Sequence, residues 1–221
     1  MKEGLLSFKN NGYKLLLFFI YDGIYFPWFL SLEKMHSQNA PFTAISIPLD
    51  FSIPFLDFFV IPYILWYAYV FLTVFYFMFR MPSVEFNKMA AFLMSGMIIT
   101  LFIYTVFPNG QLLRPDTFEN EGFCISLVKK IYKKDTPTNV FPSLHCLNSI
   151  AVTIAFFSSS RFKKNAIVLT LSFLINLLII LSTVFIKQHS ILDIFGAIGL
   201  SLVLYILIYR LPFFFKKESR A

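Results

Sequence analysis

The chain has 221 residues, of which 57% are hydrophobic and 14% are charged, and 30 of them are phenylalanine. Soluble domains carry about 25% charged residues, so this composition excludes an ordinary soluble domain and predicts an integral membrane protein. The net charge of +7 predicts no nucleic-acid partner, because the basic residues gather at the ends of apolar runs, as positive-inside sorting requires.

Six apolar runs predict an all-α, six-helix membrane bundle that forms a single domain over residues 1–221. A helix that crosses a bilayer needs roughly 17–25 apolar residues. The predicted spans are residues 13–30, 58–78, 90–107, 144–157, 167–186 and 191–211. The fourth run is shorter than a full span, and we expect its helix to continue through the serines 158–160.

The distribution of basic residues predicts the orientation in a plasma membrane. With six crossings, four basic groups fall on one side: Lys2, Lys9 and Lys14; Arg80 and Lys88; Arg161, Lys163 and Lys164; and Arg210, Lys216, Lys217 and Arg220. The positive-inside rule makes this side cytoplasmic, which places both termini inside and the loop 108–143 outside. That loop also carries Lys129, Lys130, Lys133 and Lys134, with the acidic residues Asp116, Glu119, Glu121 and Asp135 beside them.

Acidic residues near the spans give two further expectations. The segment PLDFSIPFLDFF, residues 48–59, predicts an amphipathic or re-entrant lead into the second span, because its two prolines interrupt a helix and Asp50 and Asp57 favour the membrane interface. Asp22, inside the first span, leaves two readings open: it marks a polar path, or it faces the bundle and bonds to a neighbouring group.

Three polar clusters lie at the predicted outer ends of the spans: LLRP with Arg114, FPSLH with Ser143 and His145, and KQHSILD with Lys187, His189 and Asp193. Ser143 is a good N-cap, which puts His145 beside the free amides of a first helical turn, a favourable place for an anion. His189 and Asp193 are four residues apart and share one helix face, so the carboxylate can orient the ring.

Together these residue types indicate phosphoryl transfer. One histidine can attack phosphorus while the other protonates the leaving oxygen. Arg114 offers a planar fork of donors to phosphate oxygens, and Lys187 adds a point charge. The sequence has no dense group of carboxylates for magnesium, so we expect neither a metal nor another cofactor.

The three clusters resemble the motifs of the type 2 phosphatidic acid phosphatase superfamily, whose pattern is Lys-x6-Arg-Pro, Pro-Ser-Gly-His and Ser-Arg-x5-His-x3-Asp. Arg114-Pro115, Pro142-Ser143-Leu144-His145, Ser182 and His189-x3-Asp193 match it, within a motif core of about residues 100–210. The resemblance implies a phosphohistidine on His189, oriented by Asp193, with His145 as general acid and with Arg114 and Ser143 holding the phosphate.

The sequence departs from this pattern at two cation positions, where Phe107 and Thr183 stand. We expect Lys187 to replace one of the missing cations. TPTNVFPSLH and FIKQHSILD look like a bacterial subgroup close to inositolphosphorylceramide and sphingomyelin synthases, so the expected reaction is either hydrolysis of a lipid phosphate or transfer of a phospholipid headgroup. An inactive phosphate-binding relative and a lipid transporter are the non-enzyme alternatives, and the sequence does not determine the oligomeric state.

Overall fold

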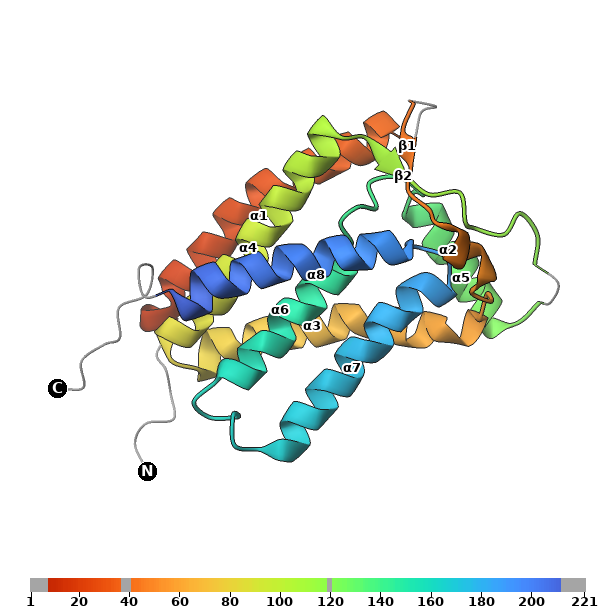
Figure 1. Cartoon of the computed structure of the whole chain (residues 1–221). Helices are drawn as coiled ribbons and strands as arrows, with labels where there is room; N and C mark the ends of the chain where they lie inside the picture. Colours follow the sequence, from red (N-terminus) through yellow and green to blue (C-terminus); the bar gives the residue numbers. More distant parts are fainter. Residues whose placement is uncertain (1–7, 37–40, 119–120, 212–221) are drawn as a thin grey trace.

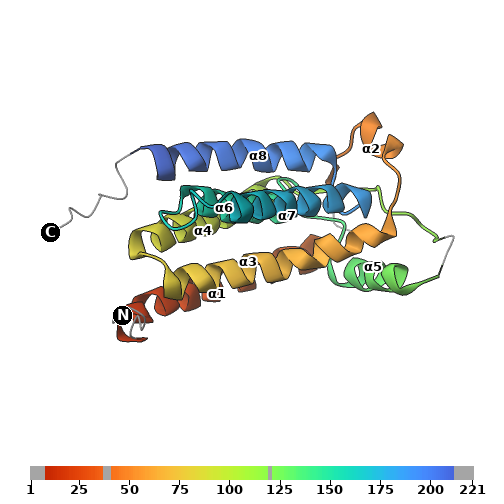
Figure 2. The same cartoon turned by 90° about the horizontal axis from the view of Figure 1, so that it is seen from below.

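The computed structural model describes residues 8–36, 41–118 and 121–211, with the side chains of residues 12–35 in the first range. Its long helices lie side by side in one bundle (Figures 1 and 2): α1 (Phe8–His36), α3 (Val60–Arg80), α4 (Ser83–Val106), α6 (Leu144–Ser158), α7 (Ala166–Phe185) and α8 (Ile191–Tyr205), which a π-helix (Ile206–Arg210) continues. Within the described ranges, five of these helices are long and apolar enough to cross a membrane, and α6 is a shorter apolar helix. The predicted all-α membrane bundle is confirmed.

Helix α6 lies at the centre of the bundle, where it packs against α3, α4, α7 and α8 (Figure 1). Small side chains allow this packing: Ala151 and Ala155 of α6 belong to the main core cluster, and Gly96 of α4 faces Leu147 of α6 at short distance. The expectation that this helix continues to residue 160 is wrong. It ends at Ser158, because the backbone of Ser159 is extended and its hydroxyl accepts a hydrogen bond from the N–H of Arg161, at 3.2 Å.

The connections at the end of the bundle where α6 and α8 begin contain short elements. The strands β1 (Thr43–Ala44) and β2 (Asn109–Gly110) pair in parallel, with Thr43 opposite Asn109. After β1 come α2 (Pro48–Ser52) and a 3₁₀ turn (Asp57–Phe59) that leads directly into α3. The pairing of β1 with β2 fixes the segment before α3 to the long loop that follows α4.

Two features of this end differ from the sequence-based expectations. The long loop contains an amphipathic helix, α5 (Phe123–Lys134), which buries Ile125 and Val128, whereas the sequence was interpreted there only through its charges. Asp50, which the sequence predicted at the membrane interface, is 2% exposed and hydrogen-bonded to the start of α8, so its carboxylate faces protein donors and not solvent. A charged residue can be buried in this way where donors of another segment satisfy it.

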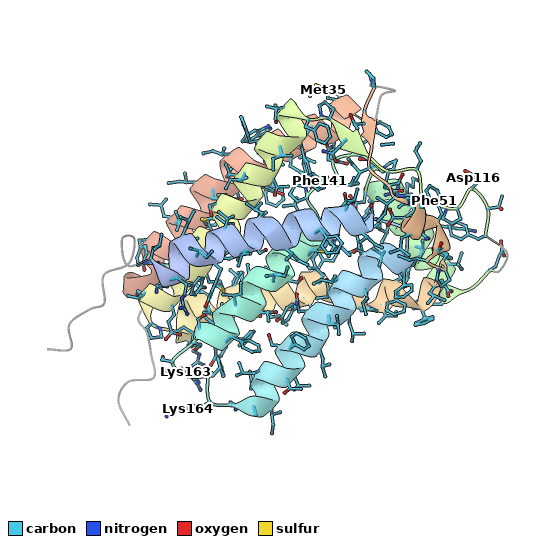
Figure 3. All side chains as sticks on the ribbon, viewed as in Figure 1. Met35, Phe51, Asp116, Phe141, Lys163 and Lys164 are labelled. Carbon is cyan, nitrogen blue, oxygen red and sulfur yellow. The ribbon has the colours of Figure 1, made fainter. Side chains whose placement is uncertain are left out.

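The structure separates the two sets of connections to opposite ends of the bundle. Figure 3 shows Lys163 and Lys164 at one end and Phe51 and Asp116 at the other. Asp22, inside α1, is partly buried. The long helices between the two ends expose large apolar side chains, among them Phe19, Phe71, Phe173 and Phe195, as expected of surfaces that face lipid.

Two glycines of α8 offer a matched test of this packing. A Cβ on Gly196 would lie 2.6 Å from the ring of Phe141, whereas a Cβ on Gly199 would meet no atom within 4 Å. We expect Gly196→Ala to lower the free energy of unfolding by about 1–3 kcal/mol through overpacking, and Gly199→Ala to be neutral or slightly stabilising. Thermal unfolding midpoints of the two variants in detergent check this, and equal midpoints would contradict the close contact between Gly196 and Phe141.

Candidate active site

The loop before α8 and the first turn of α8 carry the third polar cluster. Ser190 is the N-cap, whose hydroxyl accepts from the N–H of Leu192 at 3.1 Å. In return, Oδ2 of Asp193 accepts from the N–H of Ser190 at 2.9 Å, which completes a capping box. The same oxygen lies 3.1 Å from Nδ1 of His189. The cap of the helix and the orientation of the histidine therefore depend on one carboxylate.

The first turn of α6 lies against this group. Ser143 is the predicted N-cap, and its hydroxyl accepts from the N–H of Cys146 at 3.3 Å. Its own N–H donates to the backbone oxygen of Asp193 at 3.1 Å. Because this bond joins the starts of α6 and α8, it brings His145 next to His189.

The two imidazole rings are in contact. Nε2 of His189 lies 3.4 Å from Nδ1 of His145. With Nδ1–H of His189 donating to the carboxylate of Asp193, Nε2 of that ring keeps a lone pair and accepts from Nδ1–H of His145. The His145 ring is packed between Tyr63 and Trp66 of α3, with ring centroids 4.5 and 4.4 Å away. The site thus presents one histidine lone pair and one histidine N–H on facing atoms.

A small cavity of about 50 Å³ opens beside the two rings. It is large enough for a few water molecules. Its wall includes both histidines and Gln188, the carboxylates of Glu33 and Asp135, the polar residues Thr136, Thr138 and Asn139, and the apolar residues Phe29, Tyr104, Val140 and Leu144. Among the residues that the structure describes, no lysine or arginine lines this cavity.

Arg114, which we expected to bind phosphate, lies behind the wall of the cavity. Its guanidinium stacks over the Tyr132 ring, 4.4 Å from the centroid, and its fork donates to the backbone oxygens of Tyr132, Asp135 and Thr136 and to Oε1 of Gln188. Burial lowers the pKa of this guanidinium, and the nearby carboxylate of Asp135 opposes that shift. In this structure Arg114 fixes the wall and does not line the cavity.

Lys187, expected to replace a missing cation, has a different set of partners. Its ammonium donates to the backbone oxygens of Asp50 and Ile53, both at 2.6 Å. Burial lowers the pKa of this ammonium, and the charge of Asp50 partly offsets the shift. Lys187 is not among the residues that line the cavity, so the structure gives no support to its expected contact with phosphate.

Gln188, which the sequence analysis missed, links the wall of the cavity. Its amide donates to the hydroxyl of Tyr63 at 3.3 Å and to Oδ2 of Asp135 at 3.1 Å, and the same carboxylate oxygen accepts from Tyr63 at 2.9 Å. The position of Gln188 between Lys187 and His189 was the available signal. Its partners, however, lie on α3 and after α5, far away in the sequence.

The sequence analysis also missed Asn109, because its partners Val140 and Phe141 lie far away in the sequence. Its Oδ1 accepts from the N–H groups of Val140 and Phe141, at 2.9 and 2.8 Å, and its Nδ2 donates to the backbone oxygen of Phe107 at 2.8 Å. A single buried side chain therefore holds the segment that leads into α6. Neither its neighbours nor its residue type indicates this role in the sequence.

Comparison with known proteins gives one finding. A family model described as the PAP2 superfamily matches residues 88–217, which is more than half of the chain. No curated protein and no solved structure matches it. The matched range contains His145, His189 and Asp193, and it begins after α1, α2 and α3.

The family pattern has two cations at positions where this chain has Phe107 and Thr183. Among the described residues of the cavity wall, no lysine or arginine replaces them. Phe107 is exposed at the end of α4. Thr183 is buried in α7, where its hydroxyl donates to the backbone oxygen of Ile180 at 2.7 Å. The negative side chains of the wall are therefore not balanced by a cation at either position.

The contacts of Arg114 predict a role in stability that is independent of any substrate. A lysine cannot satisfy the acceptors that the fork of Arg114 reaches, so we expect Arg114→Lys to lower the free energy of unfolding by about 1–3 kcal/mol. Arg80→Lys, at the exposed end of α3, is the matched control and should be neutral. Thermal unfolding of the two ligand-free variants measures these changes in stability. An unchanged midpoint for Arg114→Lys would contradict a structural role of Arg114.

Proposed function

Because the chain belongs to the PAP2 superfamily, we propose that it is a membrane enzyme that transfers a phosphoryl group from a lipid-linked phosphate through a phosphohistidine on His189. The observation that carries the proposal is the line from Asp193 to His189 to His145, with contacts of 3.1 and 3.4 Å. A carboxylate, an oriented nucleophile and a proton donor are the groups that covalent catalysis at phosphorus needs.

The first step forms the bond between Nε2 of His189 and phosphorus and breaks the bond from phosphorus to the leaving oxygen. Asp193 keeps the proton on Nδ1 of His189 and stabilises the positive ring that forms. His145 acts in this step as an imidazolium: its Nδ1–H protonates the leaving oxygen while Nε2 keeps its proton, so the ring becomes neutral. The first-turn amides of α6, beside Ser143, offer donors to the phosphate oxygens.

In the second step water or a lipid hydroxyl attacks phosphorus. His145, now without its proton on Nδ1, removes the proton of the attacking oxygen, and the bond to Nε2 of His189 breaks. A phosphoryl group cannot enter between ring nitrogens that are 3.4 Å apart. Substrate binding therefore moves the two rings apart.

We place the site at the extracytoplasmic face of a plasma membrane that the chain crosses six times, with both termini in the cytoplasm. Support comes from the positive-inside rule and from the position of Lys163 and Lys164 at the end of the bundle opposite Phe51 and Asp116 (Figure 3). The apolar tail of the substrate would then lie among the helices while its phosphate reaches the histidines.

The acidic wall of the cavity favours a second candidate reaction, the transfer of a phospholipid headgroup. Glu33 and Asp135 line the cavity. Arg114 lies beside Asp135 and partly offsets its charge, but a carboxylate at Glu33 repels a phosphate monoester dianion. A phosphodiester whose headgroup ends in an ammonium fits better, because the carboxylates and the rings of Phe29 and Tyr104 attract a cation. A headgroup-transfer reaction is also in line with the resemblance of TPTNVFPSLH and FIKQHSILD to inositolphosphorylceramide and sphingomyelin synthases.

Turnover of defined lipids tests the proposed function. We expect purified protein to act on at least one lipid in a panel of phosphatidic acid, phosphatidylglycerol phosphate, polyprenyl diphosphate and intact phospholipids. His189→Ala should abolish turnover, and His145→Ala should lower it by about 10²–10⁴-fold. Lys129→Gln, on the exposed face of α5, is the control and should leave turnover unchanged.

Two results of this assay contradict the proposal. Retained turnover in both histidine variants removes these residues from the chemistry. Equal inactivity of wild type and variants on every lipid favours an inactive relative, and lipid movement between leaflets without cleavage favours a transporter.

The acidic wall predicts a change of substrate preference in Glu33→Gln. We expect kcat/KM for a donor with a cationic headgroup to fall about tenfold relative to that for phosphatidic acid, which corresponds to roughly 1.4 kcal/mol. The ratio of the two kcat/KM values cancels effects of the mutation on the amount of folded protein. Glu121→Gln, which removes one negative charge at an exposed position, is the control. An unchanged ratio would show that Glu33 does not select the headgroup.

A further inference from the structure

The segment of residues 47–53, which contains α2 and is called the α2 brace below, lies against the loop that carries His189. Asp50 is its buried centre, at 2% exposure. Oδ2 of Asp50 accepts from the hydroxyl of Ser190 at 2.7 Å, and Oδ1 accepts from the N–H of Ile191 at 2.8 Å. The carboxylate therefore holds the two residues that directly follow His189.

The α2 brace also holds the residue on the other side of the loop. The ammonium of Lys187 donates to the backbone oxygens of Asp50 and Ile53, both at 2.6 Å. The backbone of Lys187 has a φ of 55°, which is the left-handed region that residues with a side chain rarely occupy. Such a conformation persists only where the surroundings enforce it. Here the α2 brace holds the side chain of Lys187, and Nε2 of Gln111 donates to its backbone oxygen at 2.9 Å.

The charge of Asp50 is compensated where it lies. Its two oxygens face the first turn of α8, and the N-terminus of a helix favours a negative charge. Oδ2 also accepts from the N–H of Ile47 at 2.8 Å, so three donors replace the water that the buried carboxylate lost. A buried carboxylate with this set of partners holds its neighbours in one geometry, because every displacement leaves a donor or the charge unsatisfied.

This hold reaches the nucleophile through one further residue. Ser190, fixed by Asp50 through its hydroxyl, donates its N–H to Oδ2 of Asp193, and the same oxygen accepts from Nδ1 of His189. A shift of Ser190 therefore shifts the acceptor that orients the ring. Asp50 itself hydrogen-bonds to Ile47, Ser190 and Ile191, and so it acts on the histidine ring only through these neighbours.

We propose that Asp50 is a positioning residue for His189, and that the α2 brace supplies from outside the matched family range, residues 88–217, the rigidity that the nucleophile needs. The inference rests on the proposed role of His189. The inference also changes the role of Lys187. Its ammonium hydrogen-bonds to the α2 brace instead of taking the phosphate-binding role that the sequence had predicted.

The test compares Asp50→Asn with Asp57→Asn in the full-length protein in detergent. Asparagine keeps the shape of the side chain but removes the charge, and Asp57 is a partly exposed aspartate of the neighbouring 3₁₀ turn. Ser190→Ala, which removes one donor to Asp50, is a second variant in case Asp50→Asn does not fold. For each protein we would measure hydrogen exchange of peptides that cover residues 186–192, together with kcat and KM for the lipid that the wild type turns over.

We expect Asp50→Asn to raise hydrogen exchange in residues 186–192 and to lower kcat by about 10–100-fold, as the loss of a supporting partner does, with KM changed less than about threefold. Ser190→Ala should give smaller changes of the same kind, and Asp57→Asn should give none. A merely structural role would lower the yield of folded protein and leave kcat per folded molecule intact.

Each contrary result has one meaning. Unchanged exchange in the loop, or raised exchange with unchanged kcat, overturns the inference. Absence of turnover in wild type, or retained turnover in His189→Ala, removes the proposed function instead. In that case the exchange data alone decide whether the α2 brace holds the loop.

Discussion

Oδ2 of Asp193 accepts two hydrogen bonds, from the N–H of Ser190 and from Nδ1 of His189, and the rest of the site depends on this shared oxygen. Through the first bond it caps α8, and through the second it leaves a lone pair on the outer nitrogen of the imidazole. The backbone oxygen of the same residue accepts from Ser143, which joins the start of α6. Asp193, which is fully buried, therefore stabilises the starts of two helices and also orients the nucleophile.

The surroundings of that oxygen come from parts of the chain that are far apart in sequence. The α2 brace holds one side of the loop through Asp50, and Arg114 with Gln188 holds the other. Helix α3 supplies the aromatic rings that enclose His145, and Glu33 near the end of α1 completes the cavity wall. The family range of residues 88–217 thus contains the reacting groups, while much of their support lies before it.

The sequence predicted what depends on neighbouring residues. Apolar runs gave the long helices, and the N-cap at Ser143 and the spacing of His189 and Asp193 gave the local geometry of two helix starts. Asp50 and Glu33 could not be predicted, because their partners lie more than one hundred residues away along the chain. Arg114 was assigned to phosphate from its fork of donors and its match to the family motif, and Lys187 from its charge, whereas the fold supplies buried backbone oxygens that use the same donors.

The central claim is that His189 and His145 act on one phosphorus atom. A structure of the protein with orthovanadate, which adopts the five-coordinate geometry of phosphoryl transfer, tests it most directly. The account predicts vanadium bonded to Nε2 of His189, with Nδ1 of His145 within hydrogen-bond distance of the oxygen on the opposite side and with the two rings moved apart from their 3.4 Å contact. Vanadate bound away from His189, or a histidine pair still in contact while vanadate occupies another site, would contradict it.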